Sequence, residues 1–234
     1  LLKNKVAIIT GCARGIGKEI LKVFSENGAT VFACVRVLDK KFIDEIKNIE
    51  KKTNNKIIPI QLDFSKEEQI KSAVDKILSL NDSVDILVNN AGIIHTAIFQ
   101  MTSNNKLKEI FDINYFAQSK FTQYISKSMM KKKSGNIIYI SSTSGIDSNE
   151  GRSAYSASKA AIISESKSLS RELGSCNIRV NCIAPGLTDT DMMKNNTSEK
   201  TIKNVLERIA LKRVANPKEI ANSTLFLASD LGSY

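Results

Sequence analysis

Several residue types are scarce in this chain, and each shortage excludes a kind of chemistry. Its 234 residues include no tryptophan, three prolines and one histidine, His95. A single imidazole leaves little material for Ser-His-Asp catalysis or for a metal site, and we expect His95 to lie in a loop near a pocket. The four cysteines (Cys12, Cys34, Cys176 and Cys182) form no Cys-x-x-Cys pair and show no metal-ligand spacing. We therefore expect reduced thiols and a cytoplasmic protein.

Long apolar runs are missing as well. None approaches the roughly 18 residues that a membrane span needs, and the opening stretch LLKNKVAIIT carries no cleavage pattern of a signal peptide. We expect no membrane segment. Hydrophobic residues make up 42% of the chain and charged residues 25%, and the length suits one domain over residues 1–234.

Positive charge, in contrast, is plentiful. The formal net charge is +10, but the lysines are spread over amphipathic segments, with one short run at Lys131–Lys133. No zinc-finger or RNA-binding signature accompanies them, so we expect no nucleic-acid partner. An anionic cofactor or an acidic carrier protein would account for the excess.

A glycine-rich turn follows the first apolar run. Residues 5–10 (KVAIIT) have strand composition, the next seven read GCARGIG, and a helical pattern follows. Gly11 permits a tight turn, while Gly15 and Gly17 let backbone amides and a helix N-terminus approach a pyrophosphate. A glycine-rich turn is often only a turn, yet this context makes it a candidate dinucleotide site. Its residues are Gly11, Arg14, Gly15, Ile16 and Gly17.

The second strand, residues 30–36, ends without a carboxylate. NAD-binding units place an acidic residue there for the ribose hydroxyls, whereas this strand ends in Val35 and Arg36. Asp39 lies too far into the next segment to replace that carboxylate. Arg36, helped by Arg14, is suited to pair with a 2′-phosphate, so we predict NADP(H) rather than NAD(H).

Strands and helices alternate along the rest of the chain. Helical patterns are expected at 39–53, 66–80, 103–132 and 153–174, between apolar runs at 56–62, 84–88, 136–141 and 178–184. This alternation predicts an α/β fold, a single doubly wound Rossmann-type parallel sheet with helices on both faces.

Ligands of such sheets bind beyond the carboxyl ends of the strands. Most of the unusual residues of this chain fall at that edge. They are the glycine loop, Arg36, Asp63, Asn89–Gly92, Ser142, Pro185 and Gly186.

Tyr155 and Lys159 are four residues apart in a helical stretch, so both side chains lie on one helical face. A neighbouring cation favours the phenolate and is expected to lower the pKa of Tyr155 from its usual value of about 10. Ser142 ends the strand at 136–141 and is placed to hydrogen-bond the same substrate oxygen. The Tyr-x-x-x-Lys spacing also occurs by chance in many helices, so its meaning depends on the residues around it.

Taken together, these motifs resemble those of the short-chain dehydrogenase/reductase family over essentially the whole chain. The matching positions are Thr10-Gly11-x-x-x-Gly15-x-Gly17, Asp63, Asn89-Asn90-Ala91-Gly92, Asn114, Ser142, Tyr155-x-x-x-Lys159, Pro185-Gly186 and Thr190.

The resemblance implies catalytic roles for four residues. Tyr155 would be the general acid in reduction and the base in oxidation. Lys159 would lower the pKa of Tyr155 and hold the nicotinamide ribose. Ser142 would polarise the substrate carbonyl, and Asn114 would support a water relay that reaches Lys159.

The resemblance also implies cofactor contacts. Asp63 would contact the adenine, and Thr190 would help to place the carboxamide. Further residues of the implied cofactor cleft are Asn90, Ala91, Gly92, Pro185 and Gly186. Plainer roles stay open for two residues, because Asn114 could cap a kinked helix and Asp63 could cap the helix that follows it.

Within the family, the sequence is most similar to 3-oxoacyl-(acyl-carrier-protein) reductases, in NNAGI, IRVNCIAPGLTDTDM and RVANPKEIANSTLFLASD. It departs from them at Ile94-His95-Thr96, where they carry Arg-Asp, and at Ser175-Cys176, where a basic residue would face the carrier. The resemblance therefore implies an enzyme that reduces a ketone to a secondary alcohol. The substrate would be a 3-oxoacyl thioester, with an acyl carrier protein as partner, or another ketone or alcohol (sugar-linked, steroid or small aliphatic).

A non-catalytic NADP(H)-binding protein is the alternative from another class. Intact Ser142, Tyr155 and Lys159 argue against it.

Three expectations concern the later part of the chain. The polar segment at 187–207 is long for a connection and predicts a substrate lid, or else a mobile surface excursion. Relatives continue through one more strand after LASDLGSY, so we expect that strand to be missing from the sheet. The resemblance implies a homotetramer, or a homodimer, built through the helices around 111–132 and 153–174.

Overall fold

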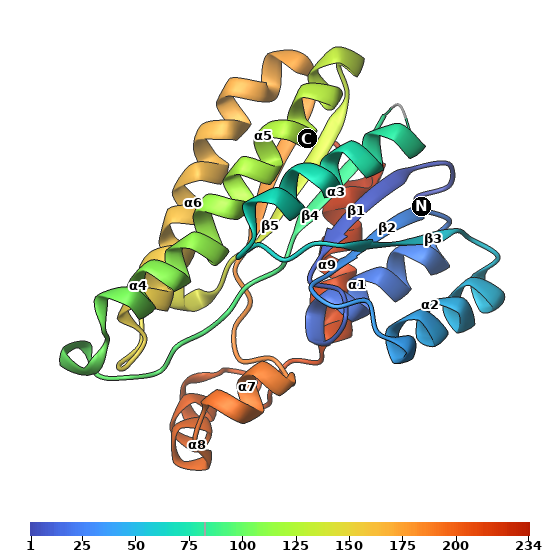
Figure 1. Cartoon of the computed structure of the whole chain (residues 1–234). Coiled ribbons are helices and arrows are strands. Elements are labelled where there is room, and N and C mark those ends of the chain that lie inside the picture. The colour runs from blue at the N-terminus through green and yellow to red at the C-terminus, as the bar shows by residue number, and fades with distance from the viewer. Residues whose placement is uncertain (82) are drawn as a thin grey trace.

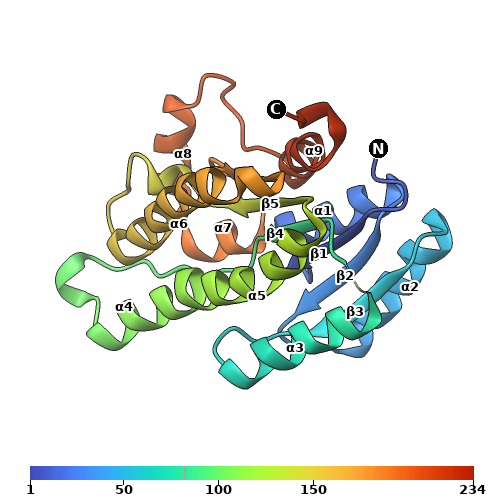
Figure 2. The same ribbon diagram turned by 90° about the horizontal axis from the view of Figure 1, so that it is seen from above.

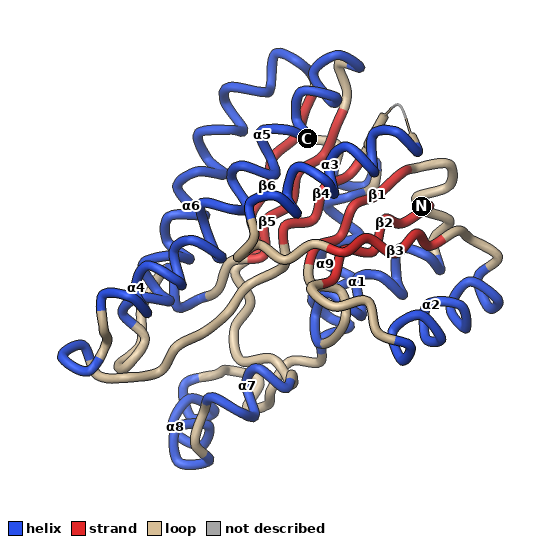
Figure 3. Tube along the Cα trace, in the orientation of Figure 1, coloured by secondary structure: helices blue, strands red, loops and turns tan. Residues whose placement is uncertain are grey.

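The computed structural model describes residues 1–81 and 83–234. Six short apolar runs form the strands of one sheet (Figures 1 and 3). They are β1 (Val6–Thr10), β2 (Thr30–Val35), β3 (Ile57–Gln61), β4 (Ile86–Asn89), β5 (Gly135–Ile140) and β6 (Ile178–Ile183). The strand order is β3-β2-β1-β4-β5-β6, and every neighbouring pair is parallel. The prediction of a doubly wound sheet is confirmed, and strand ends differ from prediction by one or two residues.

Helices cover both faces of the sheet (Figure 2). The helices of the described structure are α1 (Gly15–Glu26), α2 (Lys40–Thr53), α3 (Glu67–Leu80), α4 (Asn104–Phe111), α5 (Ala117–Lys132), α6 (Ser153–Leu173), α7 (Asp191–Asn196), α8 (Glu199–Arg208) and α9 (Pro217–Ala228), of which α7 and α8 lie apart from the sheet. Helix α9 was not predicted from the sequence. It begins with a capping box between Asn216 and Glu219 and has Pro217 in its first turn, a helix-start signal that the sequence carries openly.

The core is divided between the two faces by the alternation of strand side chains. In β1, Ile8 packs on the face covered by α3, α5 and α6, while Ala7 and Ile9 pack on the face covered by α1, α2 and α9. In β5, Tyr139 and Ile138 divide in the same way. Burial of the sheet on both sides explains why its strands are almost continuously apolar.

The helical pattern at 103–132 contains an irregular turn. The π-helical turn Asp112–Phe116 separates α4 from α5 within this stretch. The buried Asn114 lies within this turn. It therefore caps no helix, and the capping role considered for it is wrong.

The polar segment at 187–207 is more ordered than a loop. It forms α7 and α8, whose first turns are capped by the side chains of Thr190 and Ser198. Figure 1 shows both helices standing away from the sheet, below the carboxyl ends of the strands. The prediction of a long irregular connection is wrong because hydroxyl caps, rather than buried apolar residues, specify these helices.

Among the helices that the structure describes, none combines the length and the apolar character that crossing a bilayer requires. In the same part of the chain, His, Cys, Asp and Glu side chains form no group that could hold a metal ion.

Candidate active site

The glycine loop leaves the N-terminus of α1 open. Gly11 and Gly15 have positive φ angles of 68° and 56°, which favour glycine. A Cβ atom at Gly17 would lie 2.4 Å from the carbonyl oxygen of Gly11 and 2.4 Å from Nδ2 of Asn90. The N-cap residue, Arg14, makes no side-chain cap, and the first turn holds no acidic residue. Unpaired helix amides therefore face the loop, as phosphate binding requires.

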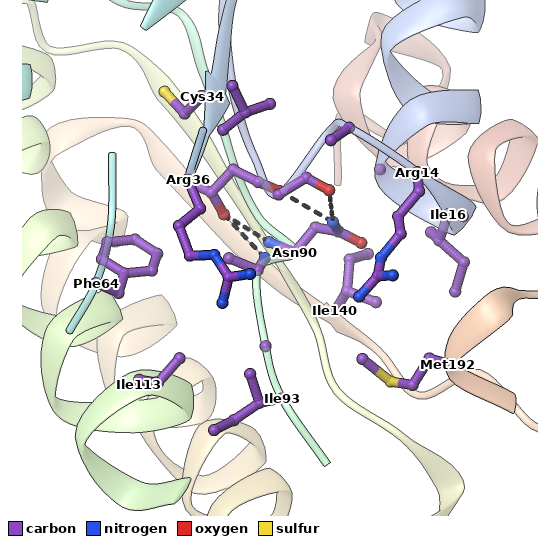
Figure 4. Close-up of a pocket in the computed structure, with 18 of the residues that line it drawn as sticks. Arg14, Ile16, Cys34, Arg36, Phe64, Asn90, Ile93, Ile113, Ile140 and Met192 are labelled. Carbon is purple, nitrogen blue, oxygen red and sulfur yellow. Dashed lines mark hydrogen bonds between the residues drawn. The ribbon is translucent and has the colours of Figure 1, made fainter. Parts of the chain in front are cut away.

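Thr10 and Asn90 join the ends of β1 and β4 beside this loop. Asn90 Nδ2 donates to the carbonyl oxygens of Thr10 (2.9 Å) and Gly11 (3.1 Å). Thr10 Oγ1 accepts from the amides of Asn90 (3.0 Å) and Ala91 (3.1 Å). These bonds surround Asn90 in Figure 4 and fix the backbone at the point where the strand order reverses.

A cleft of about 630 Å³ opens at this edge of the sheet; we call it the first cleft. Most of the predicted cofactor residues line it. They are Gly11, Arg14, Gly15, Ile16, Gly17, Arg36, Asp63, Asn90, Ala91, Gly92, Tyr155, Lys159 and Thr190. Pro185 and Gly186 line a different cleft. Asn89 is buried, and its Nδ2 donates to Thr122 of α5, so its expected place in the cleft lining is wrong.

Two arginines enter the first cleft at the end predicted for the 2′-phosphate. Figure 4 shows Arg14 and Arg36 on either side of Asn90. Asp39 also lines the cleft, but its Oδ1 accepts the amide of Phe42 (2.7 Å) and caps α2.

Burial disfavours ionisation of Asp63, yet hydrogen bonds from Ser65 and the charge of Arg36 outweigh it and lower the pKa of that carboxyl.

Asp63 does not cap α3. Its carboxylate accepts from Ser65, and the N-cap residue of α3 is Lys66, which makes no side-chain cap. The capping role considered for Asp63 is therefore wrong, and the residue stays available at the rim of the first cleft.

A second cleft, of about 370 Å³, adjoins the first. It lies between the end of β5, the N-terminus of α6 and the α7–α8 segment, and Ser142 lines it. Tyr155 and Thr190 line both clefts. His95 lies in the loop after β4 and lines a separate hollow beside α7, so its expected place near a pocket is confirmed.

The predicted catalytic residues meet where the two clefts join. Lys159 Nζ lies 5.9 Å from the centre of the Tyr155 ring and donates to the carbonyl oxygen of Ile140 (2.8 Å). Burial raises the pKa of Tyr155, opposed by a hydrogen bond with Ser142 and by the charge of Arg152. The expected lowering of the Tyr155 pKa by Lys159 is thus absent, because Lys159 faces a carbonyl and burial lowers its own pKa to about 8.

Asn114 supports this site from behind. Its Oδ1 accepts the amide of Ile93 (2.8 Å), and its Nδ2 donates to the carbonyl oxygen of Ile93 (2.9 Å) and to Ser158 (3.1 Å). A Cβ at Gly92 would lie 3.2 Å from Asn114 Oδ1 and 3.6 Å from Lys159 Nζ. Asn114 and Lys159 therefore both lie beside Gly92. Asn114 also fixes the loop that contains Gly92 and Ile93 through its two bonds to the backbone of Ile93.

These features agree with the family comparison. A sequence model of the short chain dehydrogenases matches residues 5–201. The chain belongs to the short-chain dehydrogenase/reductase family. Members are NAD(P)-dependent oxidoreductases that interconvert CH–OH and C=O groups. The resemblance predicted from the motifs is confirmed.

Named relatives of this short-chain dehydrogenase differ in substrate. It is 39% identical to a 3-oxoacyl-(acyl-carrier-protein) reductase of Chlamydia muridarum over 100% of this chain and 94% of the relative. It is also 39% identical to a 3alpha-hydroxysteroid dehydrogenase of Mediterraneibacter gnavus, over 100% and 93%. A solved structure from Beutenbergia cavernae, named for NAD(P)-dependent gluconate 5-dehydrogenase and holding NADP at low occupancy, aligns with a TM-score of 0.92. Its sequence is 27% identical, with 100% of this chain and 92% of that chain covered.

The sequence analysis overlooked several groups of this short-chain dehydrogenase. Ser141 Oγ donates to the carbonyl oxygen of Lys159 (2.8 Å), and the backbone carbonyl of Ile140 holds the lysine itself. Backbone acceptors leave no sequence signal. Arg152 does leave one, because it precedes Tyr155 by three residues and so shares its helical face.

Lys131–Lys133 lie at the opposite edge of the sheet. Lys132 pairs with Asp85, just before β4, and Lys133 ends α5 shortly before β5 begins. Both clefts are at the carboxyl ends of the strands. Lys131–Lys133 therefore lie at the end of the sheet away from both clefts.

Proposed function

We propose that this short-chain dehydrogenase reduces a 3-oxoacyl compound to the secondary alcohol with NADP(H), using Tyr155 as the general acid. The observation that carries the proposal is that Tyr155 lines both clefts, with Ser142 on one side and Lys159 on the other. A proton donor at this junction can reach a substrate oxygen while the first cleft holds the cofactor.

The first cleft fits a dinucleotide phosphate. The open N-terminus of α1 and the Gly17 position, where a Cβ has no room, suit a pyrophosphate against the backbone. Arg14 and Arg36 would hold the 2′-phosphate, while Asp39 is committed to capping α2. These features support NADP(H) over NAD(H). When bound, the cofactor supplies a hydride for the carbonyl carbon.

The chain's own part is to orient the carbonyl and to provide a proton. Burial raises the pKa of Tyr155, so its phenol is protonated at neutral pH and suited to donate. Ser142, which lines the second cleft with Tyr155, would share the same carbonyl oxygen. Lys159 would hold the nicotinamide ribose of the cofactor, and Asn114 would keep the loop at Gly92 in place.

The relatives support 3-oxoacyl thioesters as the first substrates to test. A relative of equal identity is named for a steroid alcohol, so overall identity does not choose between them. An acyl carrier protein is the corresponding partner.

We further propose a homotetramer assembled through α5 and α6, and a monomeric mass by light scattering would contradict it.

The deciding experiment follows NADPH absorbance with acetoacetyl-CoA and with a panel of steroid, sugar and small aliphatic ketones. Turnover of the thioester by the wild type, reduced about 100- to 10,000-fold in Tyr155→Phe, supports the proposal. Preference for another ketone would keep the chemistry and reject the 3-oxoacyl class. Binding of NADPH with no turnover of any ketone would favour a non-catalytic NADP(H)-binding protein.

A further inference from the structure

Arg152 is a half-buried cation beside Tyr155, and no carboxylate of the described residues forms an ion pair with it. It is the N-cap residue of α6 and lines the second cleft. Glu150 is the other charged residue in that lining, and among the described residues no ion pair joins Arg152 to any carboxylate. Partly buried charges are normally paired, because burial removes their hydration. Burial indeed lowers the pKa of Arg152.

The contacts that Arg152 makes leave part of its guanidinium free. Nη2 donates to the carbonyl oxygen of Asn196 (2.8 Å), the last residue of α7, and to Thr197 Oγ1 (3.0 Å), the residue after it. A guanidinium carries five N–H donors. In the described structure these two bonds use one nitrogen, so Nε and Nη1 each remain able to donate a hydrogen bond. A carboxylate that accepts one of them would form a charge-assisted hydrogen bond.

The surroundings of Arg152 also favour an anion. Helix α6 begins at Ser153 without an acidic residue in its first turn and without a side-chain cap, so its dipole adds positive potential. Much of the second cleft is lined by hydroxyl and amide groups. They are Ser142, Ser144, Asn149, Thr188, Asn196, Thr197, Ser198 and Thr201. Apolar side chains, among them Leu187, Met192 and Met193, share this lining. The polar groups would therefore surround an anion, while the apolar groups contact the rest of the substrate.

We infer that Arg152 binds an acidic group of the substrate, and that the natural substrate is an oxo acid whose carboxylate lies close to the reacting carbonyl. Arg152 and Tyr155 are one helical turn apart and line one cleft. The phosphate of a thioester carrier lies at the far end of a long arm, so the carboxylate is the source we assign. This inference rests on the proposed ketone reduction, and it assigns a free oxo acid in place of the thioester as the natural substrate.

The test compares two ketones that differ in charge but little in shape, acetoacetate and ethyl acetoacetate. With NADPH, the wild type should prefer the acid, and the acid-to-ester ratio of kcat/KM should fall about 10- to 100-fold in Arg152→Gln. The ratio is the informative quantity because Arg152 also acts on the pKa of Tyr155, an effect that both substrates share. Arg152→Lys keeps the charge but replaces the guanidinium by an ammonium on a shorter side chain, so its ratio should lie between those of the wild type and Arg152→Gln.

Thr197→Val is the matched control, since it removes a bond of the guanidinium to the α7–α8 turn and keeps the cation. It should change acid and ester alike. An equal loss of kcat/KM for both ketones in Arg152→Gln would overturn the inference. Arg152 would then have only the structural role of bonding Asn196 and Thr197. A loss confined to acetoacetyl-CoA would assign the cation to the carrier phosphate and overturn the carboxylate.

A binding measurement separates this inference from the proposed function. Acetoacetate is titrated calorimetrically into the protein saturated with NADP⁺. If no ketone is reduced, the proposed function fails, yet acid binding that weakens about 10- to 100-fold in Arg152→Gln would still support the Arg152 site. Absence of acid binding to the wild type would overturn it.

Discussion

The side-chain nitrogen of Lys159 lies 2.8 Å from the carbonyl oxygen of Ile140 and is almost completely buried. The ammonium is therefore held by a neutral acceptor, and burial lowers its pKa from 10.5 to about 8. The unfolded chain keeps this proton to higher pH than the folded protein does. Stability attributable to Lys159 should consequently rise with pH between about 8 and 10.5.

Lys159→Met tests that relationship. Relative to the variant, the wild type should gain about 3 kcal/mol in free energy of unfolding between pH 8 and pH 10.5, from urea titrations at both values. Lys71→Met replaces an exposed lysine by methionine and provides the control for that change of side chain. A constant difference between wild type and Lys159→Met would mean that Lys159 is not desolvated as the structure indicates.

Two glycines give a matched pair for the cofactor loop. Gly17→Ala places a Cβ 2.4 Å from Gly11 and Asn90, whereas a Cβ at Gly174 meets no described atom within 4 Å. Gly17→Ala should cost about 1–3 kcal/mol of stability and weaken NADPH binding. The added Cβ would force the Asn90 side chain, which bonds the carbonyl oxygens of Thr10 and Gly11, to move. Gly174→Ala should leave the melting temperature within a few degrees. NADPH affinity equal to wild type in Gly17→Ala would argue against the phosphate-binding role of the loop.

The two arginines of the first cleft make the cofactor preference testable. Arg36→Ala should weaken NADPH binding about 10- to 100-fold while NADH binding changes far less, because only NADPH carries the 2′-phosphate. Fluorescence titration of both cofactors measures this directly. Lys71→Ala removes a distant positive charge and controls for net charge. Equal weakening of NADPH and NADH would contradict the assignment of Arg36 to the phosphate.

Helices α7 and α8 are expected to close over the clefts as a lid. Residues of α7 line both clefts, and the turn after it is bonded to Arg152. Limited proteolysis should therefore cut between residues 187 and 208 more slowly when NADPH is bound. Cleavage at the same rate with and without NADPH would leave this segment as a surface excursion.

The sheet and the ends of its strands were predictable because they depend on local patterns. Apolar runs such as KVAIIT fix strands, and the alternation with helices fixes the parallel arrangement. The same logic placed Gly11, Asn90 and Ser142 at one edge. Prediction of the local backbone failed where hydrogen bonds between distant parts of the chain determine its conformation. The π-helical turn at Asn114 exists because this side chain bonds both backbone groups of Ile93, a contact that spacing does not reveal.

Electrostatics were the least predictable part of the site. The i, i+4 spacing correctly brought Tyr155 and Lys159 together, but it did not show that Lys159 turns to the carbonyl of Ile140. The pKa of Tyr155 is consequently set first by burial. Arg152 was overlooked although it precedes Tyr155 by three residues, because a lone arginine is ordinary in sequence. It becomes unusual once the structure shows that none of the described carboxylates pairs with it.

The π-helical turn Asp112–Phe116 sets a limit on how this chain can tolerate a change in length. A π turn holds one more residue than a regular helical turn, so deleting one of its residues would produce an uninterrupted helix from α4 through α5. The flanking helices would stay in phase, because the π turn had accommodated the extra residue within a single turn. The shortened helix would lose the widened turn from which Asn114 bonds both backbone groups of Ile93. A more regular backbone at this point would be incompatible with a working site.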